Sequence, residues 1–547
     1  MCWCTGGFSL LNCKRFKDPI YGYIDIEQKI ISEIVDTAGF QRLRNIIQTS
    51  YAPLYSSAVH NRFVHSLGVY HLGCIVTQTV DEDRDSFSEI EAFQRYLYIF
   101  RLACLLHDLG HAPFSHTGEG YYLEKGDRTL LHNSIIELSN DSDLQEEIKN
   151  RNYNAAPHEL MSVIVSLKQF DNLFQSEAEK SFFARCITGY QYVKKTDALH
   201  AFLNCMISLL NSSVIDVDKL DYLIRDAYIT GFETVSIDYE RLLRSIRIRK
   251  LDDKYEIVYL KGAISVIENV VYAHDAERKW IQNHPVVQYE AYLLQSAIEA
   301  IKEKYGDTNI FSYDALTSTG VKVSDEYKVS LLCDADIIFL MKNLDNESID
   351  EYYERKNRRH PLWKSESEYK AIFNVGFTDN LFEIVEKSLE ELCKYLNFVN
   401  KSQEINEKAL QACKDDLQKY LKLAESDTKN KSKHDAAIEK KKKCLQWLNV
   451  LKSFADSQKI PFDFVIIRAN QFTSGFAKEA FAKIKIEFDM LKKPCYFEKV
   501  TNVLRAEKSV RDKFYYLYYR RSEDNHSIDL KEFAILLGQT AMKEVFE

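Results

Sequence analysis

The chain has 547 residues. A single hydrophobic core rarely organises a chain of this length, so we expect two or three packed units. Apolar residues make up 46% and charged residues 28%, as in soluble globular proteins, and the scarcity of Gly and Pro favours helices. The net charge of −9 gives no general attraction to nucleic acid or anionic membranes. No apolar run approaches the roughly 20 residues that span a bilayer. Twelve cysteines without a regular spacing favour a reducing, cytoplasmic compartment.

Apolar residues at helical spacing predict the elements of the first half of the chain. Residues 30–50 are typical of a helix, a loop and a second helix, and Pro53 follows them. Apolar side chains recur with a period near 3.6 in residues 65–80 and again in residues 92–109, which predicts two core helices. A polar stretch around residues 125–127 indicates an insertion, after which the scaffold resumes at Pro157.

The second half begins with a short β element. Alternating apolar residues within 246–260 predict a hairpin, and helical patterning returns in 265–304 and 331–342. A basic segment at 355–359 is either a phosphate contact or a solvated face. Residues 405–451 predict two antiparallel helices, and the aromatic and alternating runs after Pro461 predict a small α+β lobe.

These patterns predict a mostly α protein in three parts. We expect a core with surface insertions at 1–395, a helical hairpin at 396–456 and a C-terminal α+β lobe at 457–547.

Three sequence motifs carry the chemistry: HNRFVHSLGV at 60–69, LLHDLGHAPFSH at 105–116 and DVDKLDYLIRD at 216–226. They place His65, His107, Asp108 and Asp218 on apolar helices. Buried imidazoles and carboxylates are costly to desolvate unless they share a partner, and a divalent cation meets that need. Mixed nitrogen and oxygen ligands suit Mn, Fe, Zn, Co or Mg without choosing among them.

With these motifs the chain resembles the HD-domain dNTP triphosphohydrolases, which include bacterial dGTPase-like enzymes and the animal dNTPase with a sterile alpha motif. The resemblance starts at KDPIYGYIDI (17–26), continues through DTAGFQRLRN (36–45) and covers about two thirds of the chain. It implies an HD-domain helical core with a small β-hairpin, a helical insertion and the C-terminal lobe. It also implies that His65, His107, Asp108 and Asp218 bind one metal ion, with additional Mg accompanying the nucleotide.

The resemblance assigns further side chains to the phosphates and to proton transfer. Arg62, His111, His116 and Lys219 would handle the phosphates, and a triphosphate does need cations and hydrogen-bond donors beside the metal. Surface salt bridges are the alternative for Arg62 and Lys219.

The acid–base pair would be His158 and Glu119, where the family has an aspartate in place of Glu119. His158 would protonate the leaving nucleoside oxygen after water attacks the α-phosphorus. The alternative is that His158 is an ordinary core histidine.

The remaining assignments concern the sugar, the phosphates and an activator. Gln48 and Asp226 would hold the 3'-hydroxyl, Tyr222 would pack on the sugar, and Arg278 would be a further phosphate contact. Asp36, Gln41 and Arg44 match positions that bind a guanine nucleotide activator in the animal enzyme, and a helix salt-bridge network is the alternative. Activation of that kind would accompany assembly into a homo-oligomer, a dimer or a tetramer.

The sequence therefore predicts a metal-dependent enzyme that converts dNTPs to deoxynucleoside and inorganic triphosphate, and phage defence is a hypothesis for its role. One alternative is a phosphodiesterase or nuclease that acts on single-stranded nucleic acid with the same metal site. The other is a nucleotide-sensing regulatory module that works mainly through partner binding.

Overall fold

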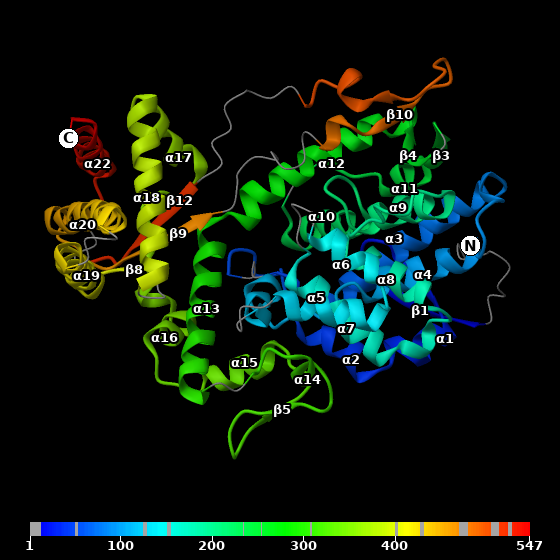
Figure 1. Cartoon of the computed structure of the whole chain (residues 1–547), viewed down its shortest axis with the longest axis horizontal. Helices are drawn as coiled ribbons and strands as arrows, with labels where there is room; N and C mark the ends of the chain where they lie inside the picture. Colours follow the sequence, from blue (N-terminus) through cyan, green and yellow to red (C-terminus); the bar gives the residue numbers. More distant parts are fainter. Residues whose placement is uncertain are drawn as a thin grey trace. The chain divides into compact units, whose positions relative to one another are not determined.

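The structure is a computed structural model, and it is mostly α-helical with a few small sheets, as predicted (Figure 1). It describes residues 12–49, 53–123, 128–149, 155–232, 235–252, 254–306, 309–399, 403–426, 431–469, 480–504, 514–522 and 528–546.

The described residues form two compact units whose segments alternate along the chain. The first unit draws on Met1–Glu277, Leu294–Asn346 and Ser474–Lys508, and the second on Arg278–Leu293, Glu347–Thr473 and Ser509–Glu547. The division predicted from the sequence is consecutive, and it stays a prediction.

Helices dominate the first unit. The long helix α3 (Arg62–Glu82) packs against α4 (Phe93–Leu106) and α10 (Val217–Thr230), and α8 (Glu177–Thr188) joins α4 to α7 (Pro157–Gln169) (Figure 1). Helices α3 and α4 correspond to the two predicted core helices. The predicted insertion contains α5 (Arg128–Ser139) and α6 (Ser142–Lys149), whereas residues 125–127 lie outside the described residues.

Small strands border this helical core. At the N-terminal side, β1 (Cys13–Asp18) pairs antiparallel with β2 (Gly22–Glu27). The predicted hairpin is confirmed as β3 (Ile246–Leu251) and β4 (Lys254–Leu260), which pair Ile248 with Ile257. Strand β10 (Lys485–Glu487) adds to β4 in parallel, so a segment that the sequence assigned to the C-terminal lobe completes a sheet of the first unit.

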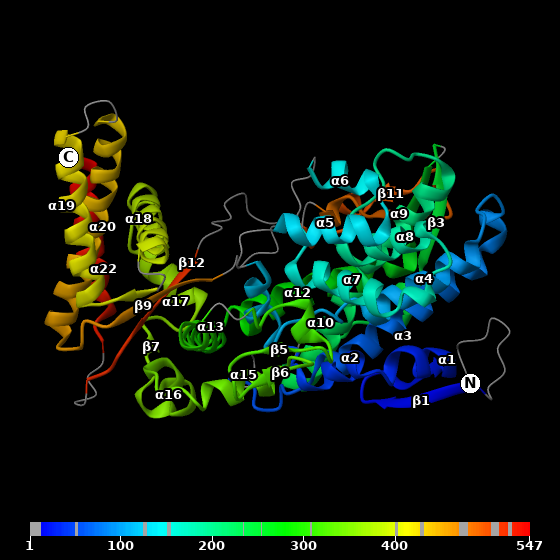
Figure 2. The same ribbon diagram turned by 60° about the horizontal axis from the view of Figure 1, so that its bottom comes forward.

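The second unit combines a helical group with a sheet. Helices α18 (Asp379–Val399), α19 (Glu407–Ser426), α20 (Lys431–Gln458) and α22 (Leu530–Phe546) pack together, as Figure 2 shows. The predicted helical hairpin is confirmed as α19 and α20. Strands β12 (Phe514–Tyr519) and β9 (Phe464–Ala469) form the antiparallel centre of the sheet, and Trp363 and Trp447 lie in the apolar core.

Two arginines of the basic segment point inward in this unit. Arg359 pairs with Glu351 at 3.1 Å and with Asp463 at 2.8 Å, and Arg358 pairs with Glu290. The structure therefore gives these two guanidinium groups carboxylate partners in place of a solvated face. Among the described residues, no helix is both long and apolar enough to cross a membrane.

Candidate metal centre and active site

Helix α3 begins just before the first candidate ligand. Asn61 caps the helix, because its Oδ1 accepts a hydrogen bond from the Val64 amide at 3.2 Å. His65 follows one turn later and is fully buried. Its Nδ1–H donates to Asp221 Oδ2 at 2.7 Å, which orients the ring so that Nε2 points into the site.

The structure corrects one expectation about the second motif. Residues 92–109 were predicted to be helical, but α4 ends at Leu106 and His107 and Asp108 lie in the turn that follows. The turn runs against α7, where the Gly110 amide donates to Ser162 Oγ at 2.8 Å and a Cβ on Gly110 would lie 2.2 Å from the Ser162 nitrogen. Glycine is therefore required there, and the turn orients both candidate ligands.

Helix α10 brings the last candidate ligand to the site through a close helix contact. A Cβ on Gly68 of α3 would lie 1.9 Å from Asp221 Oδ1 and 2.5 Å from Arg225 Nη2. The missing side chain thus lets α10 lie close to α3. Asp218, in the first turn of α10, then reaches His65.

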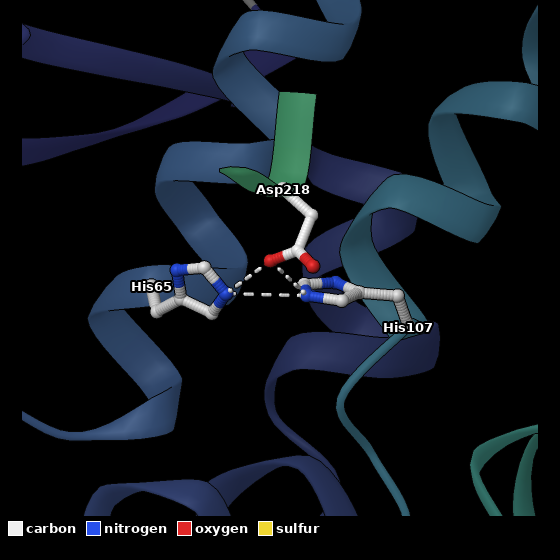
Figure 3. A group of neighbouring side chains, drawn as sticks. All are labelled: His65, His107 and Asp218. Atoms are coloured by element: carbon white, nitrogen blue, oxygen red, sulfur yellow. Dashed lines mark hydrogen bonds and ion pairs between the residues drawn. The ribbon is translucent and has the colours of Figure 1, made fainter. Parts of the chain in front are cut away.

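Three of the four candidate ligands converge, as Figure 3 shows. His65 Nε2 lies 3.0 Å from Asp218 Oδ1 and 3.2 Å from His107 Nε2, and His107 Nε2 lies 3.5 Å from Asp218 Oδ1. The fourth, Asp108, has one carboxylate oxygen 3.4 Å from His107 Nε2 and the other 3.6 Å from His65 Nε2. Two imidazoles and two carboxylates fit a divalent cation with nitrogen and oxygen preference.

The surrounding charges and hydrogen bonds together keep both carboxylates ionised. Burial opposes the charge on Asp108, but Arg62, His107 and His111 hold its pKa well below the usual range. The pKa of Asp218 is lowered in the same way, because hydrogen bonds from His107 and His65 outweigh the burial. Burial also lowers the pKa of His65, yet hydrogen bonds to Asp218 and Asp221 raise it to about 10. A cation bound by these side chains would take the place of the proton in the hydrogen bond between His65 and Asp218.

Arg62 and His111 lie directly beside Asp108. Arg62 Nη1 donates to Asp108 Oδ2 at 2.7 Å, Nε donates to Ser115 Oγ at 2.8 Å, and Nη2 donates to the Gln48 carbonyl at 3.1 Å. His111 Nε2 lies 3.1 Å from Asp108 Oδ1. Burial and the charge of Arg62 lower the pKa of His111 well below its ordinary value. His111 is therefore neutral beside a permanent cation.

His158, Glu119 and His116 form the next cluster. His158 Nδ1 donates a short hydrogen bond to Glu119, and His116 Nδ1 lies 3.1 Å from the other oxygen of the same carboxylate. The His158 ring stacks on His111 with centroids 4.1 Å apart. Burial lowers the pKa of His158, but Glu119 outweighs that effect and raises it to about 9. The structure thus joins the two residues of the predicted acid–base pair.

Lys219 and Tyr222 lie on the same helix as Asp218. Lys219 Nζ donates to Asp216 Oδ2 at 2.7 Å and to the Ser212 carbonyl at 2.8 Å, so its ammonium group is held at the start of α10. Burial raises the pKa of Tyr222, which keeps its hydroxyl neutral.

His60 links Gln48 and Asp226, the two residues predicted to hold the 3'-hydroxyl of the sugar. His60 Nε2 lies 2.7 Å from Asp226 Oδ1, and the His60 carbonyl accepts from the Gln48 amide at 2.9 Å. Gln48 is buried, and its side-chain Oε1 has no hydrogen-bond partner among the described residues. Arg278 belongs to the second unit, and its role stays a prediction.

The predicted activator residues are close in sequence and partly bonded to each other. Gln41 accepts from Arg44 Nε at 2.7 Å and donates to the Val35 carbonyl, and Arg44 stacks on the Phe63 ring at 3.5 Å. Asp36 lies 3.6 Å from Lys14 Nζ. These contacts are those of the alternative, a local polar network, and they leave a nucleotide role open to test.

Sequence reasoning missed the partners behind the ligands. Asp221, Arg225 and Asp18 form a buried chain that ends on His65, with Arg225 donating to Asp18 at 2.9 Å and to Asp221 at 2.9 Å. Asp221 and Arg225 sit inside the DVDKLDYLIRD motif on the face of α10 that carries Asp218, one signal that could have found them.

Comparisons with known proteins agree with the motifs. The model of the HD domain matches residues 62–162. The uncharacterised protein YwfO of Bacillus subtilis is 30% identical over 303 residues, which cover 55% of this chain and 58% of that protein. The Xenopus laevis protein named deoxynucleoside triphosphate triphosphohydrolase SAMHD1 is 32% identical over 254 residues, covering 45% of this chain and 38% of that protein. The chain thus spans about half the length of the curated relatives it matches.

A solved structure supports the fold. The crystal structure of a hypothetical protein from Aquifex aeolicus covers 96% of this chain and 99% of that chain with a TM-score of 0.52 and 17% sequence identity. The match to the HD domain covers residues 62–162, the part of the chain that carries His65, His107 and Asp108. Among the relatives of the chain are proteins named as dNTP triphosphohydrolases, so the resemblance to the HD-domain dNTP triphosphohydrolases is confirmed.

Proposed function

We propose that this protein is a metal-dependent hydrolase that cleaves dNTPs into deoxynucleoside and inorganic triphosphate. The observation that carries the proposal is the convergence of His65, His107 and Asp218, with Asp108 held between them and Arg62. A divalent cation at these ligands would supply a Lewis acid that polarises a phosphate oxygen. The relatives named as dNTP triphosphohydrolases support the choice of substrate.

The residues beside the ligands suit the charge of a triphosphate. Arg62 carries a fixed positive charge, and the neutral ring of His111 next to it keeps one N–H, which would donate a hydrogen bond to a phosphate oxygen. Lys219 adds an ammonium group at the start of α10, close in sequence to Asp218. These groups would orient the phosphates and neutralise charge that builds up during attack.

His158 suits the role of the acid. Its Nδ1–H is engaged by Glu119, so the proton available to the substrate is the one on Nε2 of the imidazolium. Attack by water forms a bond to the α-phosphorus and breaks the bond to the nucleoside oxygen. The His158 Nε2 proton would pass to that oxygen, and the water proton leaves to solvent.

A product assay separates this reaction from nuclease chemistry. Purified protein with Mn is incubated with each of the four dNTPs or with a labelled single-stranded oligonucleotide, and the products are resolved by anion-exchange chromatography. Inorganic triphosphate and deoxynucleoside in equal amounts are expected. Shortened strands without triphosphate would contradict the proposal. His107→Ala with Asp108→Ala should be inactive, whereas His200→Ala, at a histidine paired with Asp197 outside this cluster, should keep full activity.

Two finer proposals concern regulation and role. A guanine nucleotide bound by Asp36, Gln41 and Arg44 would assemble the chain into an active homo-oligomer, and GTP-dependent change of mass in light scattering tests this. Depletion of dNTPs would make phage defence a consequence of the reaction, and phage plating on cells that carry the inactive double variant tests that.

A further inference from the structure

A buried arginine that the proposed reaction does not use holds the turn after α4. Arg42 lies in the short helix η3 (Arg42–Asn45) and is 3% exposed. Its Nη1 donates to the His111 carbonyl at 3.0 Å and to the Leu332 carbonyl at 2.7 Å, and its Nη2 donates to the Leu109 carbonyl at 2.6 Å. One guanidinium group thus satisfies three backbone acceptors, two of them within the motif that carries His107 and Asp108.

A buried carboxylate holds the other end of the same loop. Asp334 is the first residue of α15 (Asp334–Met341) and is 7% exposed. Its Oδ1 accepts from the Phe114 amide at 2.7 Å, and its Oδ2 accepts from the Ile47 amide at 2.9 Å. It therefore ties the loop to the segment that contains Gln48.

The loop between these two anchors has a backbone conformation that needs support. Phe114 and Ser115 both have positive φ, 56° and 54°, in the left-handed region that side chains disfavour. Such residues persist only where the surroundings over-determine them. Ser115 in turn accepts from Arg62 Nε at 2.8 Å and donates to the Ile47 carbonyl at 2.5 Å. The orientation of Arg62 thus depends on this loop.

We propose that Arg42 and Asp334 are positioning residues that hold the backbone of residues 107–116 in the geometry of the active site. They act through backbone groups, from two segments distant in sequence, on the loop that carries His107, Asp108 and His111. The inference rests on the proposed function for its effect on turnover. Its structural part, a clamp on this loop, stands on its own.

Arg42→Gln and Asp334→Asn test the clamp by amide hydrogen exchange. Both variants should exchange faster than the wild type in peptides that cover residues 107–116. Peptides from α20, in the other unit, should be unchanged. Arg84→Gln, which removes an exposed guanidinium bonded to Asp81 at 2.6 Å, is the matched control and should leave the loop as it is. Unchanged exchange in the loop of a folded Arg42→Gln protein would overturn the proposal, whatever the activity.

Steady-state kinetics, measured well below the melting temperature, test whether the clamp affects turnover. A loop displaced by about 1 Å should lower kcat on the order of 10- to 100-fold while KM changes little. Guanidinium ion at millimolar concentration should restore part of the kcat of Arg42→Ala, whereas methylammonium should not, because only the planar cation offers donors in the directions of the lost bonds. Loss of thermal stability with full kcat would reduce Arg42 to a purely structural residue.

The two arms also separate this inference from the proposed function. If the wild type releases no triphosphate from any dNTP, the proposed function fails, and hydrogen exchange still decides the clamp. If the wild type is active and Asp334→Asn and Arg42→Gln leave both exchange and kcat unchanged, only the clamp fails.

Discussion

At the scale of single residues, the contact between His158 and Glu119 determines the protonation state of the proposed acid. Burial by itself would favour the neutral imidazole, but the adjacent carboxylate raises the His158 pKa to about 9. The folded protein therefore prefers the imidazolium. The stability that this pair contributes is present below the ordinary histidine pKa and is lost as the pH rises through about 9.

The pH profile of turnover should report that pKa. With His158 as the acid, kcat should fall as the pH rises through about 9, because the neutral ring has no proton to give. Glu119→Gln removes the charge that favours the imidazolium, so the fall should move toward lower pH. Glu137→Gln, at an exposed position on α5, should leave the profile in place. A Glu119→Gln profile that coincides with the wild type would rule out the pairing as the cause.

Asp221 should tune metal affinity without being a ligand. It accepts the His65 Nδ1–H at 2.7 Å and thereby fixes which nitrogen would face a bound cation. Asp221→Asn should weaken Mn binding about 10- to 100-fold in calorimetric titration, as removal of such partners commonly does. The matched change Asp197→Asn, at the cap of α9 (Ala198–Leu210), should not alter Mn binding. Equal affinities in the two variants would contradict a supporting role for Asp221.

At the scale of elements, the site depends on where helices end and how closely they approach. Helix α4 stops at Leu106, so His107 and Asp108 belong to a turn that Gly110 packs against α7. Helices α3 and α10 touch at Gly68. The candidate ligands thus come from the starts of two helices, α3 and α10, and from one turn, and small residues set the spacing among them.

Gly68→Ala tests that spacing. The new methyl group would lie 1.9 Å from Asp221 Oδ1, and this carboxylate is bonded to His65, Tyr21 and Arg225 and has no free direction in which to move. Helix α10 must shift, which should cost about 1–3 kcal/mol of unfolding free energy and weaken Mn binding. Urea denaturation and calorimetry measure both.

The control for this change is Gly262→Ala, where the nearest neighbour, Arg241 Nη2, lies 4.0 Å away. That variant should match the wild type within about 0.5 kcal/mol. Gly68→Ala with wild-type stability and affinity would show that the helices tolerate a wider spacing.

At the scale of the whole molecule, the first unit contains every predicted site residue except Arg278. Within this unit, His65, His107 and Asp218 face one another at distances that suit a shared cation in the folded protein. A cation that binds only the folded protein must therefore raise its stability.

Metal removal should lower the melting temperature. A free Mn concentration one hundred times the dissociation constant should add about 2.7 kcal/mol to the stability of the folded state, and EDTA should abolish this gain. Differential scanning fluorimetry measures the shift with and without Mn. In His65→Ala the shift should disappear. An equal shift in that variant would place the stabilising ion elsewhere.

The spacing of apolar and polar residues along the chain was sufficient to predict many of the helices and strands and to identify the candidate metal ligands. The period near 3.6 identified α3, the alternation identified the β3–β4 hairpin, and the apolar surroundings of His65, His107 and Asp218 indicated a shared cation. Each of these inferences uses neighbours along the chain, where residue type and geometry are directly linked. The end of α4 was beyond such patterns, because it depends on the packing of Gly110 against α7.

Only the tertiary structure decided which distant groups meet. Strand β10 pairs with β4 across more than 200 residues, and Arg42 bonds to the carbonyls of Leu109, His111 and Leu332. Every residue carries a backbone carbonyl, so no residue type in the sequence marks these acceptors. The amino acids alone determined which donors were available for a metal and for phosphate, whereas the folded chain determined what holds them in place.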